Sequence, residues 1–593
     1  MTSDGGSCAT TCGNSTTCLC TERHPGEENG TMLDLKITNG QIIDGTGAPA
    51  RAGSVGIRDG MIVAIGDVTE DARQTIDARG HVVAPGFVDI HTHYDAQVIW
   101  DRMLTISPWH GVTTAVIGNC GFGVAPTRPE HRQVIVGTLE KVEGMSVEAL
   151  NEGFGDWGFE SFPEYLDLLE DRGTAINLGV MFGHTPARLY VMGPDATERA
   201  ATPEELAQMR DLFDEAMDAG ALGLATSKAV THSGYQGKPV PSRLASFDEI
   251  LTLARVMGEK GRGLMQATVG RELFLDEFEK IVTETGRPVS WTALLAGVAL
   301  AEGTHMDQLR RSVELNARGL PIIPQVTPRA LMFEQQFSAP FIFESMSLFR
   351  DVRGADHEGK KAIYRDPAFR DSFRDKLVNG NAKPSFIASF NKTIIADVPG
   401  QPELSERLLL DVAAERGVPA TDLILDLSLE TDLAARFRMP VANHDEDEVE
   451  PLLKEKSTVI GLSDAGAHAS QLCDACLPTY LLGRWVREKG VFPIEEAVRM
   501  LTSRPAEVFG ITDRGTLAEG RPADIVIFDP DTVGAGPIRR VHDFPAGADR
   551  LISEAEGIDA VIVNGTLLRQ DNQDQVAADG ALPGRLLRHG HAA

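Results

Sequence analysis

Cysteine is scarce in this sequence, and its distribution argues against a disulfide framework. Seven cysteines occur in 593 residues, and four of them stand within the first 20 positions. The other three, Cys120, Cys473 and Cys476, are an odd number in a long body, whereas disulfide-rich secreted domains are short and carry an even number. We therefore expect free thiols in the body of the protein.

Long apolar runs and a basic stripe are also absent, and both absences exclude classes of partner. No segment reaches the roughly 18 consecutive apolar residues of a membrane span. The first residues, MTSDGGSCAT, lack the basic and apolar regions of a secretory signal. Lys and Arg total 56 against 86 Asp and Glu, a formal charge of −30, and no segment gathers basic residues as nucleic-acid binders do. We expect a cytoplasmic protein with neither a membrane nor nucleic acid as partner.

The length of 593 residues exceeds the roughly 150 of a typical domain, so we expect one large domain with a smaller satellite. Residues 1–31 are rich in Gly, Ser and Thr and poor in large apolar side chains, which predicts a disordered leader. The four leader cysteines have no convincing four-ligand metal spacing. Residues 571–593 are expected to form a C-terminal tail.

Both ends of the chain carry β-strand patterns. Apolar and polar residues alternate from Leu33, and Asn39 and Asp59, each followed by glycine, predict type I′ turns. The same kind of pattern returns near the other end in the segments DIVIF and VIVNG. Two such regions can pair only if the chain between them folds back. We therefore expect a small discontinuous β-sandwich built from residues 33–85 and 515–570.

The middle of the chain, residues 86–514, alternates apolar strands with amphipathic helices and so predicts a parallel α/β sheet. Capping boxes at Thr202–Glu205 and Ser246–Glu249 mark two of the helix starts. Eight strands are predicted to end near His91, Cys120, His184, Lys228, Thr268, Thr292, Gln325 and Asp464. Eight strands favour a TIM-type (β/α)8 barrel, whose active site lies at the carboxyl ends of the strands. Residues from about 329 to 454 show no barrel strand and are expected to be an insertion over the barrel mouth.

The strongest chemical signal is the pair His91 and His93 in PGFVDIHTHYD. Alternate residues of a strand face the same way, so the two imidazoles point together. Neutral imidazoles are the commonest ligands of a catalytic divalent metal. An H-x-H pair is also found for structural reasons, but its place directly after an apolar strand favours a metal-ligand role.

Two further residues stand at predicted strand ends. Asp464, in GLSDAGAH, is suited to bind a metal and to take a proton from its water. The alternative for Asp464 is a helix N-cap. Cys120, in GNCG, would lie one strand from the histidines, and a thiolate is a good zinc ligand. Its alternative is a small buried apolar residue, the usual fate of a free cysteine.

These motifs resemble the amidohydrolase superfamily and, within it, the D-aminoacylase (N-acyl-D-amino-acid deacylase) family. The resemblance covers roughly residues 33–570. It rests on the segments PGFVDIHTHYDAQ, GVTTAVIGNCG, GHTPAR, GALGLATS, GLSDAGAH and LTSRPAEVFGITDRGTLAEGRPADIVIFDP. The resemblance implies a TIM-type barrel with a β-sandwich, zinc held by the H-x-H pair, the cysteine and the last-strand aspartate, and hydrolysis of an N-acyl bond on a D-amino acid.

The sequence departs from the family pattern at the fifth and sixth strands. The family places a metal-binding histidine at the end of each, whereas this chain reads QATV at 266–269 and SWTA at 290–293. The ligands that remain are His91, His93, Cys120 and Asp464. A catalytic zinc typically takes three protein ligands and a water, so this set fills one site. We therefore expect one divalent metal per chain, zinc being the expected ion.

Two polar residues at the third and fourth strand ends have several interpretations. His184 would assist catalysis by polarising a carbonyl, or would be a hydrogen-bonded core residue. Lys228 would pair with a substrate carboxylate, would be exposed and solvated, or would be carboxylated and bridge metals as in some relatives. His184 is taken as a candidate catalytic residue and Lys228 as a candidate substrate-binding residue.

The loop that follows Lys228 carries two more candidates. His232 and Arg243 are predicted to bind substrate, because arginine suits bidentate binding of a carboxylate. Cys473 and Cys476 form a C-x-x-C pair without a second pair, and they are interpreted as structural.

The residues together predict a metal-dependent hydrolase that cleaves an amide with metal-activated water, Asp464 acting as base and then as acid. The substrate is expected to be a small molecule with an amide and a carboxylate, such as an N-acyl amino acid of the D series. A hydrolase of cyclic amides or carbamates is the rival within enzymes. A barrel that has lost catalysis and serves as a scaffold is the rival of another class. A homo-oligomer is left open.

Overall fold

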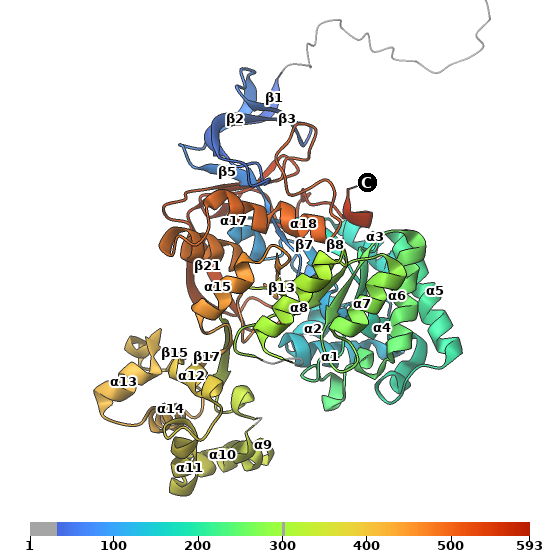
Figure 1. Cartoon of the computed structure of the whole chain (residues 1–593). Coiled ribbons are helices and arrows are strands. Elements are labelled where there is room, and N and C mark those ends of the chain that lie inside the picture. The colour runs from blue at the N-terminus through green and yellow to red at the C-terminus, as the bar shows by residue number, and fades with distance from the viewer. Residues whose placement is uncertain (1–31, 299–302, 345, 593) are drawn as a thin grey trace, which may run out of the picture.

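The two ends of the chain meet in one nine-stranded sheet of the computed structural model, which describes residues 32–298, 303–344 and 346–592. Strand β19 pairs antiparallel with β5, which joins the end regions. The strands are β1 (Leu33–Ile42), β2 (Arg51–Arg58), β3 (Met61–Gly66), β4 (Ala72–Asp77), β5 (Val82–Pro85), β19 (Ile525–Phe528), β22 (Ile558–Val563), β23 (Thr566–Gln570) and β24 (Gln573–Asp574). Figure 1 shows β1, β2, β3 and β5 together at one end of the molecule. The leader predicted for residues 1–31 lies outside the described residues.

One of the two predicted turns is wrong. Asp59 and Gly60 both have positive φ, as a type I′ turn between β2 and β3 requires. At Asn39-Gly40 the strand β1 instead continues, with a bulge in its pairing to β2 between Ile37 and Gly40. A Cβ on Gly40 would lie 2.5 Å from the side chain of Val83, so the glycine serves close packing of β1 against β5.

Eight parallel strand positions follow one another along the middle of the chain, as the alternation predicts. They form a three-stranded sheet, β6-β7-β8, and a six-stranded sheet, β9-β10-β11-β12-β13-β18. The strands are β6 (Phe87–Asp89), β7 (Val112–Ile117), β8 (Asn177–Val180), β9 (Phe182–Gly183), β10 (Gly223–Ser227), β11 (Leu264–Thr268), β12 (Val289–Thr292), β13 (Ile322–Val326) and β18 (Val459–Ile460). Strands β8 and β9 occupy one of the eight positions, separated by a single residue. Every residue of these strands is buried, as expected for parallel strands covered on both faces.

The first and last of these strand positions are joined by backbone contacts beyond their ends. The amide of His93 donates to the carbonyl of Ala465 at 2.7 Å, and the amide of Asp464 donates to the carbonyl of His91 at 3.1 Å. Thr92 and Ala465 form a parallel bridge. The residues that follow β6 and β18 are therefore held next to each other.

Helices alternate with the parallel strands and cover them. They are α1 (Arg132–Glu143), α2 (Val147–Phe154), α3 (Phe162–Arg172), α4 (His184–Met192), α5 (Pro203–Ala219), α6 (Phe247–Lys260), α7 (Leu275–Thr285), α8 (His305–Ala317), α15 (Glu446–Lys454), α16 (Leu477–Tyr480), α17 (Ile494–Leu501) and α18 (Ser503–Val508). The capping box of Thr202 and Glu205 is present in full. At α6, Ser246 accepts from the amide of Glu249, but the Glu249 carboxylate turns away to His184 and Arg188. The second predicted box is therefore only half formed.

Residues 331–442, within the segment expected to be an insertion (about 329–454), form a sheet and helices with their own core, whereas α15 at the end of that segment packs in the main core. The antiparallel sheet of residues 331–442, in the order β14-β17-β15-β16, joins neither parallel sheet within the part of the chain that is described. Its strands are β14 (Leu331–Gln336), β15 (Ile394–Asp397), β16 (Arg407–Leu408) and β17 (Arg436–Ala442), and its helices are α9 (Arg350–Gly354), α10 (His357–Arg365), α11 (Pro367–Leu377), α12 (Pro384–Asn391), α13 (Leu409–Arg416) and α14 (Ala420–Glu430). Phenylalanines 337, 343, 349 and 373 pack at its centre. Figure 1 shows α9 to α14 standing apart from the helices around the parallel strands.

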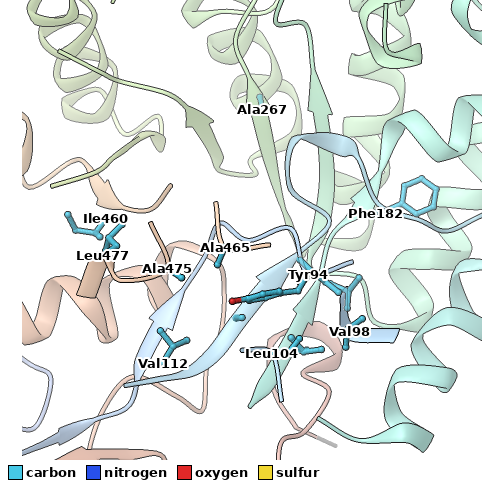
Figure 2. Packing of buried hydrophobic residues seen from close by; sticks show 14 of the residues in the cluster. Tyr94, Val98, Leu104, Val112, Phe182, Ala267, Ile460, Ala465, Ala475 and Leu477 are labelled. Carbon is cyan, nitrogen blue, oxygen red and sulfur yellow. The ribbon is translucent and has the colours of Figure 1, made fainter. Parts of the chain in front are cut away.

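The largest buried cluster lies among the parallel strands and their helices. Tyr94, Ala465 and Ala475 belong to it, together with residues of the strands themselves (Figure 2). The hydroxyl of Tyr94 lies 2.7 Å from the hydroxyl of Ser107, so its one polar atom is satisfied in the core. Among the described residues, no helix combines the length and apolar character needed to cross a membrane.

Candidate metal centre and active site

His91 and His93 follow the buried strand β6 and lie with Cys120 in one cluster. A ligand atom of each of the three residues lies within 4.8 Å of those of the other two. All three residues are buried, and His91 is almost completely enclosed. His91 Nε2 lies 3.5 Å from Cys120 Sγ. The structure therefore brings the predicted H-x-H pair and the predicted cysteine together.

Asp464 completes this cluster from the other end of the strand order. Its Oδ1 lies 3.3 Å from His91 Nε2 and 3.8 Å from His93 Nε2. The Asp464 side chain is 18% exposed, against 1% and 6% for the two histidines, so it is the most open to water of these three. No helix begins after Asp464, which removes the N-cap interpretation.

Cys120 is held in an uncommon backbone conformation. Its φ is 53°, in the left-handed region, between Gly118 and Gly121, which also have positive φ. Its backbone amide donates to Gln266 Oε1 at 2.7 Å. Burial raises the pKa of the thiol, but the nearby imidazoles of His91 and His93 outweigh it and lower the pKa to about 7. Cys120 is therefore near the protonation state that a metal ligand needs.

The donor set fits a divalent metal of zinc type. Two imidazoles and a thiol with a lowered pKa converge in a buried place, and a carboxylate stands beside them. Zinc takes nitrogen and sulfur donors of this kind, and catalytic sites keep one position open. The second group of possible ligands among the described residues, formed by His357, Glu358 and Asp432, is exposed and is paired with Lys361.

The far nitrogens of both histidines have partners that the sequence did not reveal. His91 Nδ1 donates to Gln325 Oε1 at 2.7 Å, and His93 Nδ1 lies 3.2 Å from Glu143 Oε1. Gln325 stands at the predicted end of its strand, and Gln266 lies in the middle of β11. Glu143 stands at the end of α1 and has no sequence signal at all. Such outer partners fix the tautomer of a metal-binding histidine.

His184 lies in a different, fully buried cluster. Its Nε2 donates to Glu249 Oε1 at 2.9 Å, and its Nδ1 accepts from the Thr226 hydroxyl at 2.8 Å. Arg188 forms two hydrogen bonds to the same carboxylate. Burial is the main cause that lowers the pKa of His184, which keeps the ring neutral. No hydrogen bond among the described residues joins His184 to the group of His91, His93, Cys120 and Asp464.

The loop after β10 carries the three predicted substrate-binding residues. Lys228 Nζ donates to the carbonyl of Arg243 at 2.8 Å and to that of Ala245 at 2.6 Å. Arg243 in turn donates to the carbonyl of His232 at 3.0 Å. Burial lowers the pKa of His232 to about 3, and its ring packs 4.8 Å from that of Phe122. The three residues are thus linked through the backbone of one loop.

The charged side chains of Arg329 and Asp474 lie next to the C-x-x-C pair, Cys473 and Cys476. Arg329 Nη1 donates to Cys476 Sγ and to the carbonyl of Cys473, and Arg329 Nε lies 3.2 Å from Asp474 Oδ1. A hydrogen bond from the Cys473 thiol is the main cause that lowers the pKa of Cys476 to about 6. The pair fastens the start of the insertion, at Arg329, to the segment after β18.

Comparison with known proteins identifies the family. Residues 74–568 match the model of the amidohydrolase family, and the chain belongs to this family. It is 32% identical to a D-aminoacylase of Alcaligenes xylosoxydans xylosoxydans over 95% of this chain and 99% of that protein. It is 28% identical to an N-acyl-D-aspartate deacylase of the same organism, over 96% of this chain and 98% of that one. The resemblance predicted from the motifs is confirmed.

Solved structures agree with this assignment. An N-acyl-D-glutamate deacylase of Bordetella bronchiseptica, complexed with zinc and a phosphonate inhibitor, matches with a TM-score of 0.63 and 28% identity over 94% of this chain and 100% of that one. A D-aminoacylase structure described by its binuclear metal center matches with a TM-score of 0.62 and 28% identity over 93% of this chain and 100% of that one. The α/β fold of this chain is that of its family.

Proposed function

We propose that this chain is a metal-dependent amidohydrolase that removes the acyl group from N-acyl amino acids, with D-amino acids as the preferred series. One observation carries the proposal. The donor atoms of His91, His93 and Cys120 lie within 4.8 Å of one another, with Asp464 beside them, at the carboxyl ends of parallel strands. The similarity to a D-aminoacylase over 95% of the chain supports the choice of substrate.

We further propose that the eight parallel strand positions close into a (β/α)8 barrel and that the sheet of the chain ends belongs to a β-sandwich. The bridge between Thr92 and Ala465 supports closure, because it links the segments after the first and last strands. Closure places His91 and Asp464, from opposite ends of the strand order, at the same mouth. This is the end of such a barrel at which active sites are built.

One metal ion per chain, zinc in our proposal, would be held by His91, His93, Cys120 and Asp464. Three of them, His91, His93 and Cys120, form the one buried cluster of potential metal ligands among the described residues. Lys228 is proposed to remain uncarboxylated, because its Nζ faces two backbone carbonyls that would repel a carbamate. Lys228 is therefore proposed not to bridge a second ion.

The residues of the chain account for the proton transfers of amide hydrolysis. A divalent metal in this site would lower the pKa of an adjacent water and polarise the scissile carbonyl. Asp464 is the partly exposed carboxylate of the cluster, so it can take the proton of the attacking water and deliver it to the leaving nitrogen. During these proton transfers, the hydrogen bond from the Asp464 backbone amide to the carbonyl of His91 holds Asp464 beside the metal ligands.

Lys228, His232 and Arg243 are proposed to bind the carboxylate end of the substrate. Lys228 uses two of its three N–H donors on carbonyls, which leaves one, and Arg243 keeps donors beyond its bond to His232. The role predicted for His184, donation to the developing oxyanion, requires a free N–H. Both its ring nitrogens are already bonded, so we propose that His184 organises the core through Glu249 instead.

The test is a hydrolysis screen with zinc-loaded protein. N-acetylated D- and L-forms of acidic, basic and apolar amino acids are compared with cyclic amides and carbamates, and release of the amine is measured. We expect hydrolysis of the N-acetyl-D-amino acids and its loss in Asp464→Asn at equal zinc content. Selective hydrolysis of cyclic amides or carbamates would transfer the assignment to that class. A zinc-free protein without activity on any substrate would favour the scaffold.

A further inference from the structure

Two glutamines flank the candidate metal centre on strands β11 and β13, and neither has an assigned role. Gln266 lies on β11 and Gln325 on β13, and β12 runs between these two strands. Both side chains are fully buried. Each glutamine forms one hydrogen bond to a proposed metal ligand and another to a hydroxyl group of β12, so the two glutamines have matching environments.

Gln325 connects His91 to β12. Its Oε1 accepts from His91 Nδ1 at 2.7 Å, and its Nε2 donates to the Ser290 hydroxyl at 3.0 Å. With its proton on Nδ1, His91 presents the lone pair of Nε2, the atom that faces Cys120 and Asp464. The opposite orientation of the amide would place a donor against Nδ1 and leave the proton on Nε2. The orientation of Gln325 thus selects the tautomer that can bind a metal.

Gln266 connects Cys120 to β12. Its Oε1 accepts from the backbone amide of Cys120 at 2.7 Å, and its Nε2 donates to the Thr292 hydroxyl at 3.4 Å. Thr292 donates onward to the hydroxyl of Thr268 at 3.1 Å. A backbone N–H is always a donor, so it determines which end of the amide faces Cys120. The bond also supports the left-handed conformation that aims the thiol at His91.

We propose that Gln266 and Gln325 are positioning residues that hold Cys120 and His91 in the geometry of a single-metal site, each through a hydroxyl of β12. The inference rests on the proposed function and deepens it. The polar side chains of β11 and β12 in these hydrogen bonds are all neutral: Gln266, Thr268, Ser290 and Thr292. These residues therefore contribute support for one ion and no charged ligand for another.

The arrangement gives the two histidines different partners. His91 is bonded to a neutral amide, whereas His93 faces the carboxylate of Glu143. Only one of the two imidazoles thus receives a negative outer partner, which limits the negative charge placed around the site. A glutamate at position 325 keeps an acceptor toward His91, whereas a leucine removes the acceptor at similar size. This difference makes the role testable.

The experiment measures zinc affinity by competition with a chelator in Gln325→Leu, Gln325→Glu and Gln266→Leu, with the exposed Gln575→Leu as matched control. We expect both leucine variants to lose about 10- to 100-fold in zinc affinity, the usual effect of losing an outer partner. Gln325→Glu should keep most of the zinc affinity that Gln325→Leu loses. Reconstitution with Co²⁺ gives a second readout, because Gln266→Leu should weaken the thiolate-to-cobalt absorption that reports Cys120 as a ligand.

Ser290→Ala and Thr292→Val keep the glutamines and remove their anchors, so they serve if a leucine variant does not fold, as judged by circular dichroism. Each should lower zinc affinity by a smaller factor than the corresponding leucine substitution. Wild-type affinity in both folded leucine variants, or in Ser290→Ala and Thr292→Val where a leucine variant does not fold, would overturn the inference while leaving the proposed function intact. Failure of the unmodified protein to bind zinc would instead overturn the proposed function.

Discussion

The carboxylate of Glu143, at the last residue of α1, lies 3.2 Å from Nδ1 of His93. Glu143 is buried, with 3% of its surface exposed, and its backbone carbonyl accepts from the amide of Ala469, just after the Asp464 loop. Burial lowers the pKa of His93, but the charge of Glu143 and the hydrogen bonds outweigh it and raise that pKa well above its ordinary value. Helix α1 thus connects one proposed ligand to the loop that carries the proposed base.

Glu143→Gln should weaken metal binding without removing it. The amide keeps an acceptor for His93 but lacks the charge that makes the imidazole more basic, so we expect a loss of about 10- to 100-fold in metal affinity or in kcat. Isothermal titration with zinc measures the affinity. Glu140→Gln, on the exposed side of the same helix, is the control. Equal affinity in the two variants would show that Glu143 is only a packing residue.

His91→Ala and His93→Ala should abolish turnover and release the metal while the fold survives. Each change removes one buried polar group from a strand end and leaves the sheet hydrogen bonds in place. Metal content is measured by plasma mass spectrometry, next to the circular dichroism spectrum. His357→Ala removes an exposed histidine of the insertion as control. Near-normal activity in both variants would contradict the ligand assignment.

Asp464→Asn should lower kcat by several orders of magnitude and leave KM nearly unchanged. The amide has the size of the carboxylate but cannot accept the proton of the attacking water. Steady-state kinetics with an N-acetyl-D-amino acid at fixed zinc content measure both parameters. A kcat within about tenfold of the unmodified protein would exclude Asp464 as the base.

Metal affinity should fall as the pH drops below about 7. The pKa of Cys120 is lowered to about 7, with burial opposed by the two histidines, and only the thiolate binds the ion. Protons therefore compete with the metal for the Cys120 thiolate below this pH, at about tenfold per pH unit for one proton. This competition fades above it, whereas His93, whose pKa is raised, must still lose its proton to bind the ion. Zinc affinity measured from pH 5 to 9 should show the bend, and Cys120→Ser should lower the slope. An identical slope in the variant would show that Cys120 is no ligand.

The cluster of His184, Arg188 and Glu249 should stabilise the fold above about pH 4.5 and lose this effect in acid. Burial raises the pKa of Glu249, but the hydrogen bonds from His184 and Arg188 and the charge of Arg188 lower it from 4.5 to about 2. Because the folded pKa lies below the unfolded one, the contribution, about 3 kcal/mol at most, is present above pH 4.5 and disappears between pH 4.5 and 2.

Urea unfolding at pH 3, 5 and 7 measures this contribution. Glu249→Gln should lower the free energy of unfolding at pH 7 and flatten its dependence on acid, whereas the exposed Glu284→Gln should change neither. A similar acid dependence in Glu249→Gln and the unmodified protein would contradict the explanation. Retained activity in folded Glu249→Gln would agree with an organising role of His184, away from the reacting atoms.

The sequence by itself determined the features that depend on neighbours along the chain. Alternate residues of a strand share a face, so His91 and His93 had to point together wherever β6 lay. Alternating apolar strands and helices predicted the parallel order, and polar residues after each strand marked the edge where the site lies. Thr202 and Glu205 specified a helix start because both halves of a capping box are local.

Tertiary structure alone decided how these residues are used, because the deciding contacts join distant parts of the chain. Glu249 has the sequence of a capping box, yet the buried charge of Arg188 and the ring of His184 draw its carboxylate away. Gly40 has the sequence of a turn, yet contact with Val83 keeps it within a strand. The partners of His91 and His93, Gln325 and Glu143, come from a strand and a helix far along the chain. A pattern of single residues reveals which groups can bind a metal, but the hydrogen bonds that select a tautomer and place a charge exist only after the strands assemble.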